Sequence, residues 1–210
     1  MDAEKYLSFL VQEIHTVVVA TVDDKGLPVT AAMDMMDLAD TGIYFLTAKG
    51  KGIYERLKRR GAMALTGMKG ADTMHCAAIS IRGKVRDIGS SYLPQLFEKN
   101  PYMNEIYPDT ASREALTVFH IYEGSGEWFD LSKTPIQRDS FVFGGANEIE
   151  EGYFITDACI GCKLCYSKCP QNCIDISVTP SIIRQKNCLH CGNCYEICPV
   201  RAVEKRGIGS

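Results

Sequence analysis

Two runs of cysteines near the end of the chain constrain its fold more than any other feature. The first run has cysteines at positions 159, 162, 165 and 169, and the second at 188, 191, 194 and 198. A proline follows the last cysteine of each run, and the runs hold eight of the ten cysteines. The second run repeats the first at an offset of 29 residues, and the apolar residues Ile174 and Val203 are separated by the same offset. This repeat predicts a small module made of two related halves.

Cysteines at every third position can wrap three corners of a four-iron cluster, and the fourth thiolate must then come from elsewhere. The segment closely resembles the two-cluster bacterial ferredoxins, in which the last cysteine of each run ligates the other cluster. The resemblance therefore implies two [4Fe–4S] clusters with crossed ligation. The implied ligands are Cys159, Cys162, Cys165 and Cys198 for cluster 1, and Cys188, Cys191, Cys194 and Cys169 for cluster 2.

Zinc and disulfides are the alternatives for these cysteines. Zinc sites usually pair two separated C-x-x-C motifs without a third cysteine or a trailing proline, and disulfides need no fixed triplet spacing. So small a module has little apolar core, so we expect its folding to be coupled to cluster assembly. Cys173 matches Ala202 in the repeat and is interpreted as a packing residue rather than a fifth ligand. Cys76, in an apolar strand pattern, is interpreted as a buried inert thiol, with a reactive role as the alternative.

The composition is that of a globular protein, with 46% apolar and 23% charged residues among 210. The net charge of −3 provides no basic field for nucleic acid. The polar N-terminus does not read as a signal peptide, and no apolar run is long enough for a membrane span. Cysteines kept free for iron fit a reducing compartment, so we expect a cytoplasmic protein.

The first 131 residues read as short strands with a few helices. Helical spacing of apolar residues occurs over 2–14, a basic amphipathic helix is predicted over 53–60, and a proline-marked helical interruption over 91–107. Segments typical of strands are 16–21, 27–36, 43–47, 62–68, 74–88, 116–122 and 127–131, with turns including 37–42 and 124–126. The pattern predicts a mainly β domain with some helix, folded as a closed or split antiparallel barrel.

The periodicity of apolar residues is lost after position 131, where Thr134-Pro135, Gly144-Gly145 and several glutamates occur. This composition is typical of a linker. We therefore predict a barrel domain over 1–131, a linker over 132–151 and a small α+β two-cluster domain over 152–210.

A second candidate site lies where the predicted strand 43–47 meets the helix 53–60. The hydroxyl of Thr47, the ammonium groups of Lys49 and Lys51, and glycines beside a helix N-terminus are the components of a phosphate site. A solvated basic loop is the alternative. Residues 45–58, followed by 62–65, resemble the strand, loop and helix of the FMN-binding split-barrel family related to pyridoxamine 5′-phosphate oxidase.

That resemblance implies a homodimer with FMN in a groove between two split barrels, and the FMN phosphate on the loop from Thr47 through Ala48 and Lys49 to Lys51. It also implies that Met33, Asp34, Ser80 and Arg82 flank the isoalloxazine. Trp128 is a candidate for stacking from the partner subunit, with ordinary packing as the alternative. The oxidase's C-terminal Arg-x-His signature has no counterpart here, so oxidation of pyridoxamine phosphate is not expected.

Clusters carry electrons singly, whereas a flavin takes them singly and delivers them in pairs. The sequence therefore predicts an iron–sulfur flavoprotein that reduces a small organic acceptor. A non-enzymatic electron carrier for a protein partner and a redox sensor are the alternatives. A barrel that holds another ligand, such as haem or a deazaflavin, is a further one. His15, His75 and His120 are interpreted as structural, so no residue is assigned as a proton donor.

Overall fold

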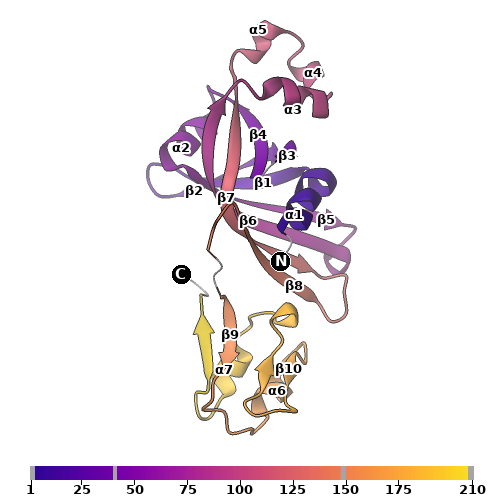
Figure 1. Cartoon of the computed structure of the whole chain (residues 1–210), viewed down its shortest axis with the longest axis vertical. Helices are drawn as coiled ribbons and strands as arrows, with labels where there is room; N and C mark the ends of the chain where they lie inside the picture. The colour runs from indigo at the N-terminus through magenta and orange to yellow at the C-terminus, as the bar shows by residue number, and fades with distance from the viewer. Residues whose placement is uncertain (1–2, 40–41, 148–149, 208–210) are drawn as a thin grey trace. The chain divides into compact units, whose positions relative to one another are not determined.

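The computed structural model describes residues 3–39, 42–147 and 150–207 (Figure 1). The chain forms two compact units. The first lies within residues 1–72, 76–128 and 140–147, and the second within 73–75, 129–139 and 148–210. Among the described residues, none of the helices has the length and apolar character needed to cross a membrane.

The first unit is built on an eight-stranded sheet in the order β2-β1-β5-β6-β7-β4-β3, with β8 paired to β7. The strands are β1 (Thr16–Val22), β2 (Pro28–Asp34), β3 (Asp37–Ala39), β4 (Gly42–Ala48), β5 (Ala62–Gly70), β6 (Cys76–Gly89), β7 (Leu116–Asp130) and β8 (Gln137–Phe143). Strands β1 and β2, β1 and β5, β5 and β6, β4 and β7, and β3 and β4 pair antiparallel. Strand β2 also contacts β4 across the curled sheet. The predicted antiparallel barrel is confirmed.

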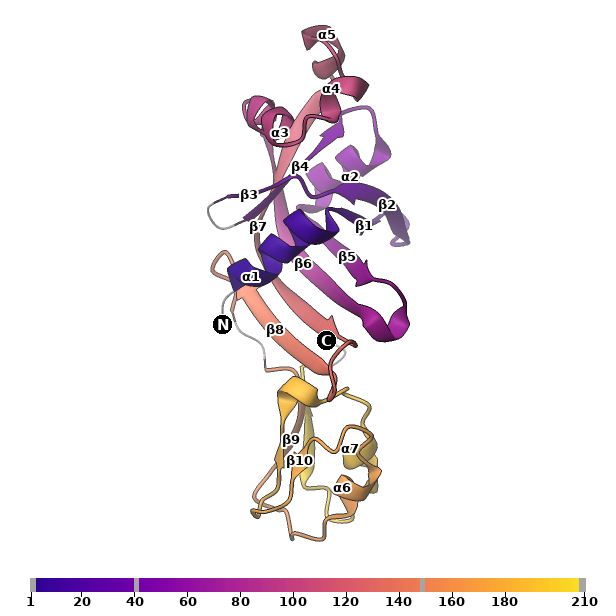
Figure 2. The ribbon, with the colours of Figure 1, turned by 90° about the vertical axis from the view of Figure 1, so that its right-hand side faces the viewer.

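The barrel core is closed by the N-terminal helix, whose apolar positions recur at helical spacing. This helix comprises α1 (Ala3–Ser8) and a π-helical continuation, η1 (Phe9–Ile14). Leu7, Leu10 and Val11 are buried in the same core as Phe45 and Phe119. Figure 2 shows the helix lying across the sheet. The helix predicted over 2–14 is therefore confirmed over residues 3–14.

The other helices of the first unit are α2 (Gly52–Arg60), α3 (Leu93–Lys99), α4 (Met103–Ile106) and α5 (Thr110–Arg113). The single 3-10 turn between β5 and β6, η2 (Thr73–His75), clusters with the second unit. The basic helix and the proline-marked helical segment were both predicted. Strand β3 was not, because the sequence there was interpreted as a turn. Asp40 and Thr41 of that predicted turn lie outside the described residues.

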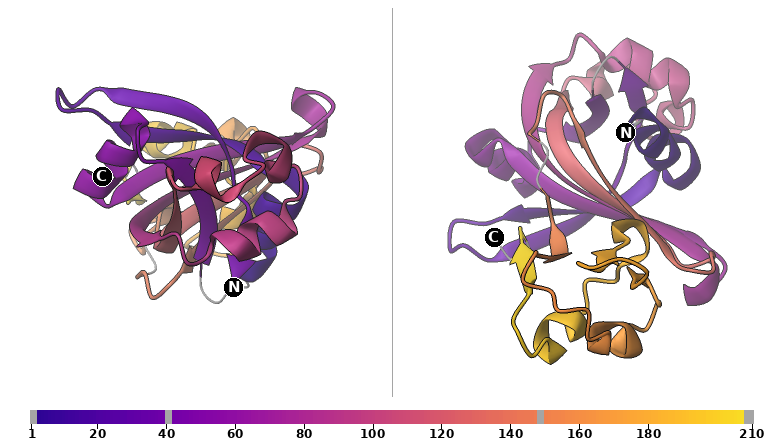
Figure 3. Two further views of the ribbon diagram at one scale, coloured as in Figure 1. Left: turned by 90° about the horizontal axis from the view of Figure 1, so that it is seen from above. Right: turned by 60° about the horizontal axis from the view of Figure 1, so that its bottom comes forward.

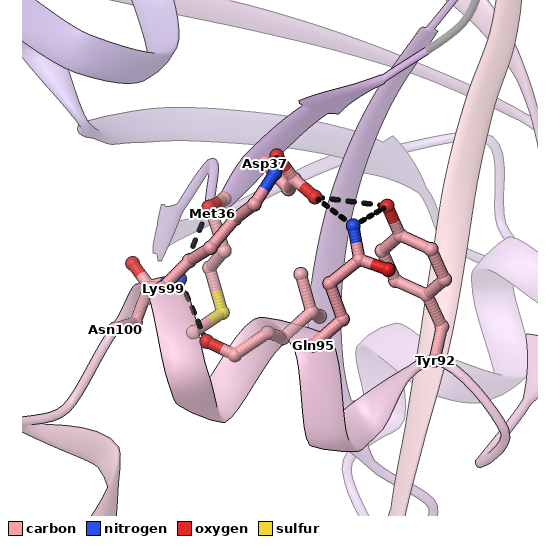
Figure 4. Close-up of polar contacts among 7 residues, drawn as sticks. Met36, Asp37, Tyr92, Gln95, Lys99 and Asn100 are labelled. Atoms are coloured by element: carbon pink, nitrogen blue, oxygen red, sulfur yellow. Dashed lines mark hydrogen bonds and ion pairs between the residues drawn. The ribbon is translucent and has the colours of Figure 1, made fainter.

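A buried carboxylate anchors α3 to β3 (Figure 4). Asp37, 4% exposed, accepts hydrogen bonds from Tyr92 Oη at 2.8 Å and Gln95 Nε2 at 3.2 Å. Lys99 Nζ lies 2.5 Å from its other oxygen. Because a buried carboxylate is costly without partners, this convergence fixes the position of α3. The Asn100 amide adds a hydrogen bond to the Met36 carbonyl at 3.0 Å.

Strand β7 corrects one prediction, because it continues through the residues 124–126 that were predicted as a turn. The glycines there provide space. A Cβ on Gly126 would lie 2.2 Å from Phe141 Cζ, and one on Gly124 would lie 2.5 Å from the Arg82 carbonyl oxygen. Glycine within a strand marks such close approach as well as turns. Sequence alone does not distinguish the two uses.

Strand β8 corrects a second prediction, because it occupies residues 137–143 of the segment predicted as a linker. Phe141 and Phe143 are buried in the barrel core. Only two apolar residues of this strand reach the core, so the alternation of apolar and polar residues is too short to indicate a strand among the surrounding Gly, Pro and Glu.

The second unit preserves the repeat that the sequence predicted. Its two antiparallel two-stranded sheets are β9 (Gly152–Ile155) with β12 (Val203–Arg206), and β10 (Ile174–Asp175) with β11 (Ile182–Ile183). The helices α6 (Leu164–Lys168) and α7 (Asn193–Ile197) lie against each other, in orange and yellow in the right-hand view of Figure 3, and a 3-10 turn, η3, covers Gln185–Asn187. Backbone angles follow the repeat, because left-handed residues recur at the same offset. The pairs are Gly161 and His190, Lys163 and Gly192, and Asn172 and Arg201.

Candidate functional site

The second unit contains two open cavities of similar size, about 330 and 360 Å³ including their mouths. Each is lined by four of the predicted ligand cysteines. The cavity of cluster 1 is lined by Cys159, Cys162, Cys165 and Cys198, and that of cluster 2 by Cys188, Cys191, Cys194 and Cys169. In both, the fourth cysteine comes from the other run, as crossed ligation requires. The ligand assignment stays a prediction, and this grouping supports it.

The donor set fits iron–sulfur clusters. All ten cysteines are free thiols in the structure, so no disulfide competes for the ligands. Within the part of the chain that the structure describes, no three His, Cys, Asp or Glu side chains converge closely enough for a single metal ion. The core of this unit is small, and three of its seven buried residues are Cys173, Cys188 and Cys194. Cluster binding would fill the space that an apolar core would otherwise occupy.

Backbone N–H groups approach the crossing cysteines at equivalent positions in the two halves. The N–H of Ala202 donates to Cys198 Sγ at 3.2 Å, and the N–H of Cys173 donates to Cys169 Sγ at 3.4 Å. Such hydrogen bonds stabilise thiolate and tune cluster potentials. Cys173 also places its own sulfur 3.4 Å from Cys169 Sγ and lines the same cavity. It is therefore a buried packing residue that touches a predicted ligand.

The segment at the start of β8 is hydrogen-bonded to Gln171, which lines the cluster 2 cavity, and to Asn187. The Ile136 N–H donates to Gln171 Oε1 at 3.3 Å, and the Ile136 carbonyl accepts from Asn187 Nδ2 at 3.0 Å. The pKa of Cys188 is lowered mainly by a hydrogen bond from Cys173, against the effect of burial, and the charge of Arg138 makes a smaller contribution in the same direction. Sequence analysis missed this role because residues 136–138 lay in the predicted linker, where a lone arginine gives no signal.

The candidate phosphate site lies between β4 and α2. Thr47 is 2% exposed, and its Oγ1 has no hydrogen-bond partner among the described residues. Helix α2 begins at Gly52 with Lys51 in the N-cap position, where no side chain caps the helix. A buried hydroxyl without a partner is costly, and the first N–H groups of a helix have no partners within the helix. An anionic ligand at this position would accept hydrogen bonds from the hydroxyl and from these N–H groups.

The two lysines of this loop differ. Lys49 donates through Nζ to the Glu114 carbonyl at 3.1 Å, and its N–H donates to the Ala115 carbonyl at 2.8 Å. Lys51 is exposed, and only its backbone is engaged, with the Ala48 and Tyr54 backbones. The structure therefore brings together Thr47, Lys51 and the start of α2, while Lys49 fastens the loop to the residues before β7.

The residues expected beside the isoalloxazine divide between the two faces of the sheet. Met33 is paired with Val17 and packs against the core, whereas Asp34 is on the other face. Ser80 and Arg82 are exposed on that second face, and the Ser80 hydroxyl is hydrogen-bonded to Thr66.

Asp34 is already engaged. It accepts hydrogen bonds from Thr16 Oγ1 at 2.6 Å and Tyr102 Oη at 2.7 Å. Burial alone would raise its pKa, but these bonds and nearby His15 outweigh burial and lower the pKa of Asp34.

Trp128 packs inside its own chain. Its ring lies edge-on to Phe9 at 4.8 Å and tilted to Tyr6 at 5.4 Å. This is the packing alternative that the sequence left open. Among the histidines, His120 is buried and stacks on Tyr44 at 4.3 Å, and His15 is hydrogen-bonded to Tyr102 at 2.9 Å.

The barrel and the paired cysteine cavities define a flavin-type split barrel joined to an iron–sulfur module. Residues 3–132 match the family described as pyridoxamine 5′-phosphate oxidase, and residues 158–202 match a 4Fe-4S dicluster domain. The chain belongs to the pyridoxamine 5′-phosphate oxidase family and carries a 4Fe-4S dicluster domain. These matches confirm the family resemblances and the fold class that the sequence predicted.

Solved structures support the fold of the first unit. A nimC/nimA family protein from Clostridium acetobutylicum aligns with a TM-score of 0.55 and 15% identity, over 66% of this chain and 90% of that one. A heme binding protein from Mycobacterium smegmatis aligns with a TM-score of 0.53 and 12% identity, over 66% and 57%. A C. acetobutylicum protein related to general stress protein 26 of B. subtilis (pyridoxinephosphate oxidase family) aligns with a TM-score of 0.50 and 19% identity, over 66% and 94%. The comparison with curated proteins gives no match.

Proposed function

We propose that this protein is an FMN-dependent reductase that passes electrons between two [4Fe–4S] clusters and FMN to reduce a small organic acceptor. The observation that carries the proposal is the presence, in one chain, of two cavities that each hold four predicted ligand cysteines, together with a buried Thr47 hydroxyl that has no hydrogen-bond partner among the described residues. FMN, when bound, supplies the conversion between single electrons and electron pairs.

The chain's own residues have separate roles in this proposal. Thr47 donates its hydroxyl hydrogen to the FMN phosphate, and Lys51 and the start of α2 provide positive charge and N–H groups. Lys49 keeps the loop in place through the Glu114 carbonyl. The eight cysteines hold the clusters, and the N–H groups of Cys173 and Ala202 stabilise the thiolates of Cys169 and Cys198.

A homodimer is part of the proposal because one face of the sheet is exposed among the described residues of its unit. Neighbouring strands present small or apolar side chains on this face. Val18 is 50% exposed and is paired with Ala32 on one side and Thr66 on the other, and Thr66 is paired with Ser80. A second copy would bury this face and bring FMN near Ser80 and Arg82.

The test is an anaerobic purification with iron, sulfide and released flavin measured per chain. We expect about eight irons per chain, the content of two [4Fe–4S] clusters, with one FMN. Clusters without flavin would refute the flavoenzyme, and a haem absorption band would show that the barrel holds a different cofactor.

Turnover assays with reduced protein then separate an enzyme from a carrier. Saturable reduction of small acceptors supports the reductase. Oxidation by protein acceptors alone would identify a carrier.

A further inference from the structure

The two halves of the second unit are related by the repeat, so differences at equivalent positions indicate where function has departed from symmetry. Beside the cluster 2 cavity, the backbone of Ile136 is hydrogen-bonded to Gln171, which lines that cavity, and to Asn187. The position equivalent to Gln171 at cluster 1 is Val200, which is 40% exposed. The predicted ligands Cys188 and Cys194 are buried, whereas their equivalents Cys159 and Cys165 are partly exposed.

The edge of the cluster 1 cavity differs from that of cluster 2 in charge and polarity. We call five exposed residues the cluster 1 rim: Ile160, Lys163, Leu164, Val200 and Arg201. The first four line the cavity, and Arg201 follows Val200. Their equivalents at cluster 2 are Leu189, Gly192, Asn193, Gln171 and Asn172. At these five positions cluster 1 therefore has three apolar residues and two cations, whereas cluster 2 has a leucine, a glycine and three uncharged amides, and its nearby cation is Arg138 from outside the repeat.

The two cations of the rim are in strained backbone conformations. Lys163 has φ of 62° and Arg201 has φ of 52°, both in the left-handed region. The equivalent positions hold Gly192 and Asn172, which accept that region with less strain. Neither cation forms an ion pair with a described residue, although exposed carboxylates lie close in sequence, Asp157 before Lys163 and Glu196 and Glu204 on either side of Arg201. Because these two positions are strained and form no ion pair that stabilises the fold, we infer that the cations have a functional role rather than a structural one.

We propose that the cluster 1 rim is the docking surface for an acidic one-electron carrier protein, an inference that rests on the proposed electron-transfer function. Ile160, Leu164 and Val200 would form the apolar centre of the contact, and Lys163 and Arg201 its charged edge. In the complex the carrier's redox centre loses one electron and cluster 1 gains it, and no bond forms or breaks.

The chemistry of the rim matches such a partner. Redox complexes are short-lived and use small contact areas, which five residues around one cavity can supply. Positive charge at the edge of a contact accelerates association with acidic partners and suppresses basic ones. Because Cys159 and Cys165 are more exposed than their equivalents Cys188 and Cys194, cluster 1 has the more accessible edge.

The test exchanges rim residues for their cluster 2 equivalents. The variant Lys163→Gly/Arg201→Asn removes both cations and relieves the left-handed strain, so we expect it to fold with its full iron content. The control Lys186→Gln/Lys205→Gln removes the same charge from the same unit outside the rim. The probe is an acidic ferredoxin, titrated by calorimetry in its oxidised form and used as a reductant in stopped-flow experiments.

We expect the rim variant to bind the oxidised ferredoxin about 10-fold more weakly at low ionic strength, and its clusters to be reduced more slowly by the same factor. High salt should abolish the difference between variant and wild type. Reduction by dithionite, which needs no docking, should be unchanged. Ile160→Gln/Val200→Gln should weaken binding at every salt concentration.

Wild-type affinity in the rim variant, or equal weakening in the control variant, would overturn the docking surface. Neither readout needs flavin. Protein that lacks FMN but keeps rim-dependent binding would refute the proposed reductase alone, whereas flavin-loaded protein without rim dependence would refute the docking surface alone.

Discussion

Crossed ligation makes a sharp prediction about single cysteine variants. Cys198 belongs to the second run in sequence but lines the cavity of cluster 1 with Cys159, Cys162 and Cys165. Cys198→Ala should therefore remove cluster 1 and spare cluster 2. The expected loss is about half of the iron and sulfide per chain, because each [4Fe–4S] cluster holds four of the expected eight irons.

The identity of the surviving cluster is read by comparing variants. Cys162→Ala should leave the same electron paramagnetic resonance spectrum as Cys198→Ala, although the two residues lie in different runs. Cys191→Ala and Cys169→Ala should share the other spectrum. Because Cys173 Sγ lies 3.4 Å from Cys169 Sγ and could replace it, the Cys169 variant is made together with Cys173→Ala.

The matched control is Cys173→Ala alone, which gives the cluster 2 half the residue type found at position 202. It should retain the full iron content. The reasoning is refuted if Cys198→Ala shares its spectrum with Cys191→Ala, because that would place Cys198 on cluster 2.

Three further predictions concern the first unit. Thr47→Val removes a buried hydroxyl that has no described partner, so the flavin-free variant should be at least as stable as the wild type. FMN binding, measured by fluorescence, should weaken by about 1.5–3 kcal/mol. Unchanged FMN affinity would contradict the role of Thr47 in phosphate binding. Gly126→Ala places a Cβ 2.2 Å from Phe141 Cζ, so it should destabilise the unit by about 1–3 kcal/mol. The loss is measured by urea unfolding followed by Trp128 fluorescence. Adding Phe141→Leu should restore part of the lost stability. The pKa of Asp34 is lowered in the folded state, so its contribution to stability is complete above the unfolded pKa of about 3.9 and is lost as pH falls through the lower folded value. Asp34→Asn should therefore reduce the fall in unfolding free energy at acid pH. An unchanged fall would show that Asp34 is not its source.

Local patterns were sufficient for much of the fold. The cysteine spacing predicted the repeat, and the left-handed residues of the second unit recur at the same offset. Alternating and helical periods located most strands and the N-terminal helix, because these periods reflect burial within a single element. Two of the strands that were missed or divided, β8 and β7, depend on contacts between Gly126 and Phe141, which are 15 positions apart in sequence.

The candidate site shows the same division. The sequence by itself determined which residues can ligate iron and where a phosphate can be held, because ligand type and spacing are local properties. Only the tertiary structure decided that Thr47 is buried without a partner, that Lys49 is used by the Glu114 carbonyl, and that Met33 faces the core. It also decided that Ile136, in a segment predicted as a linker, bonds to Gln171 at the cluster 2 cavity while the cluster 1 rim stays exposed. Partners and burial depend on residues distant in sequence, so they are set by the folded chain as a whole.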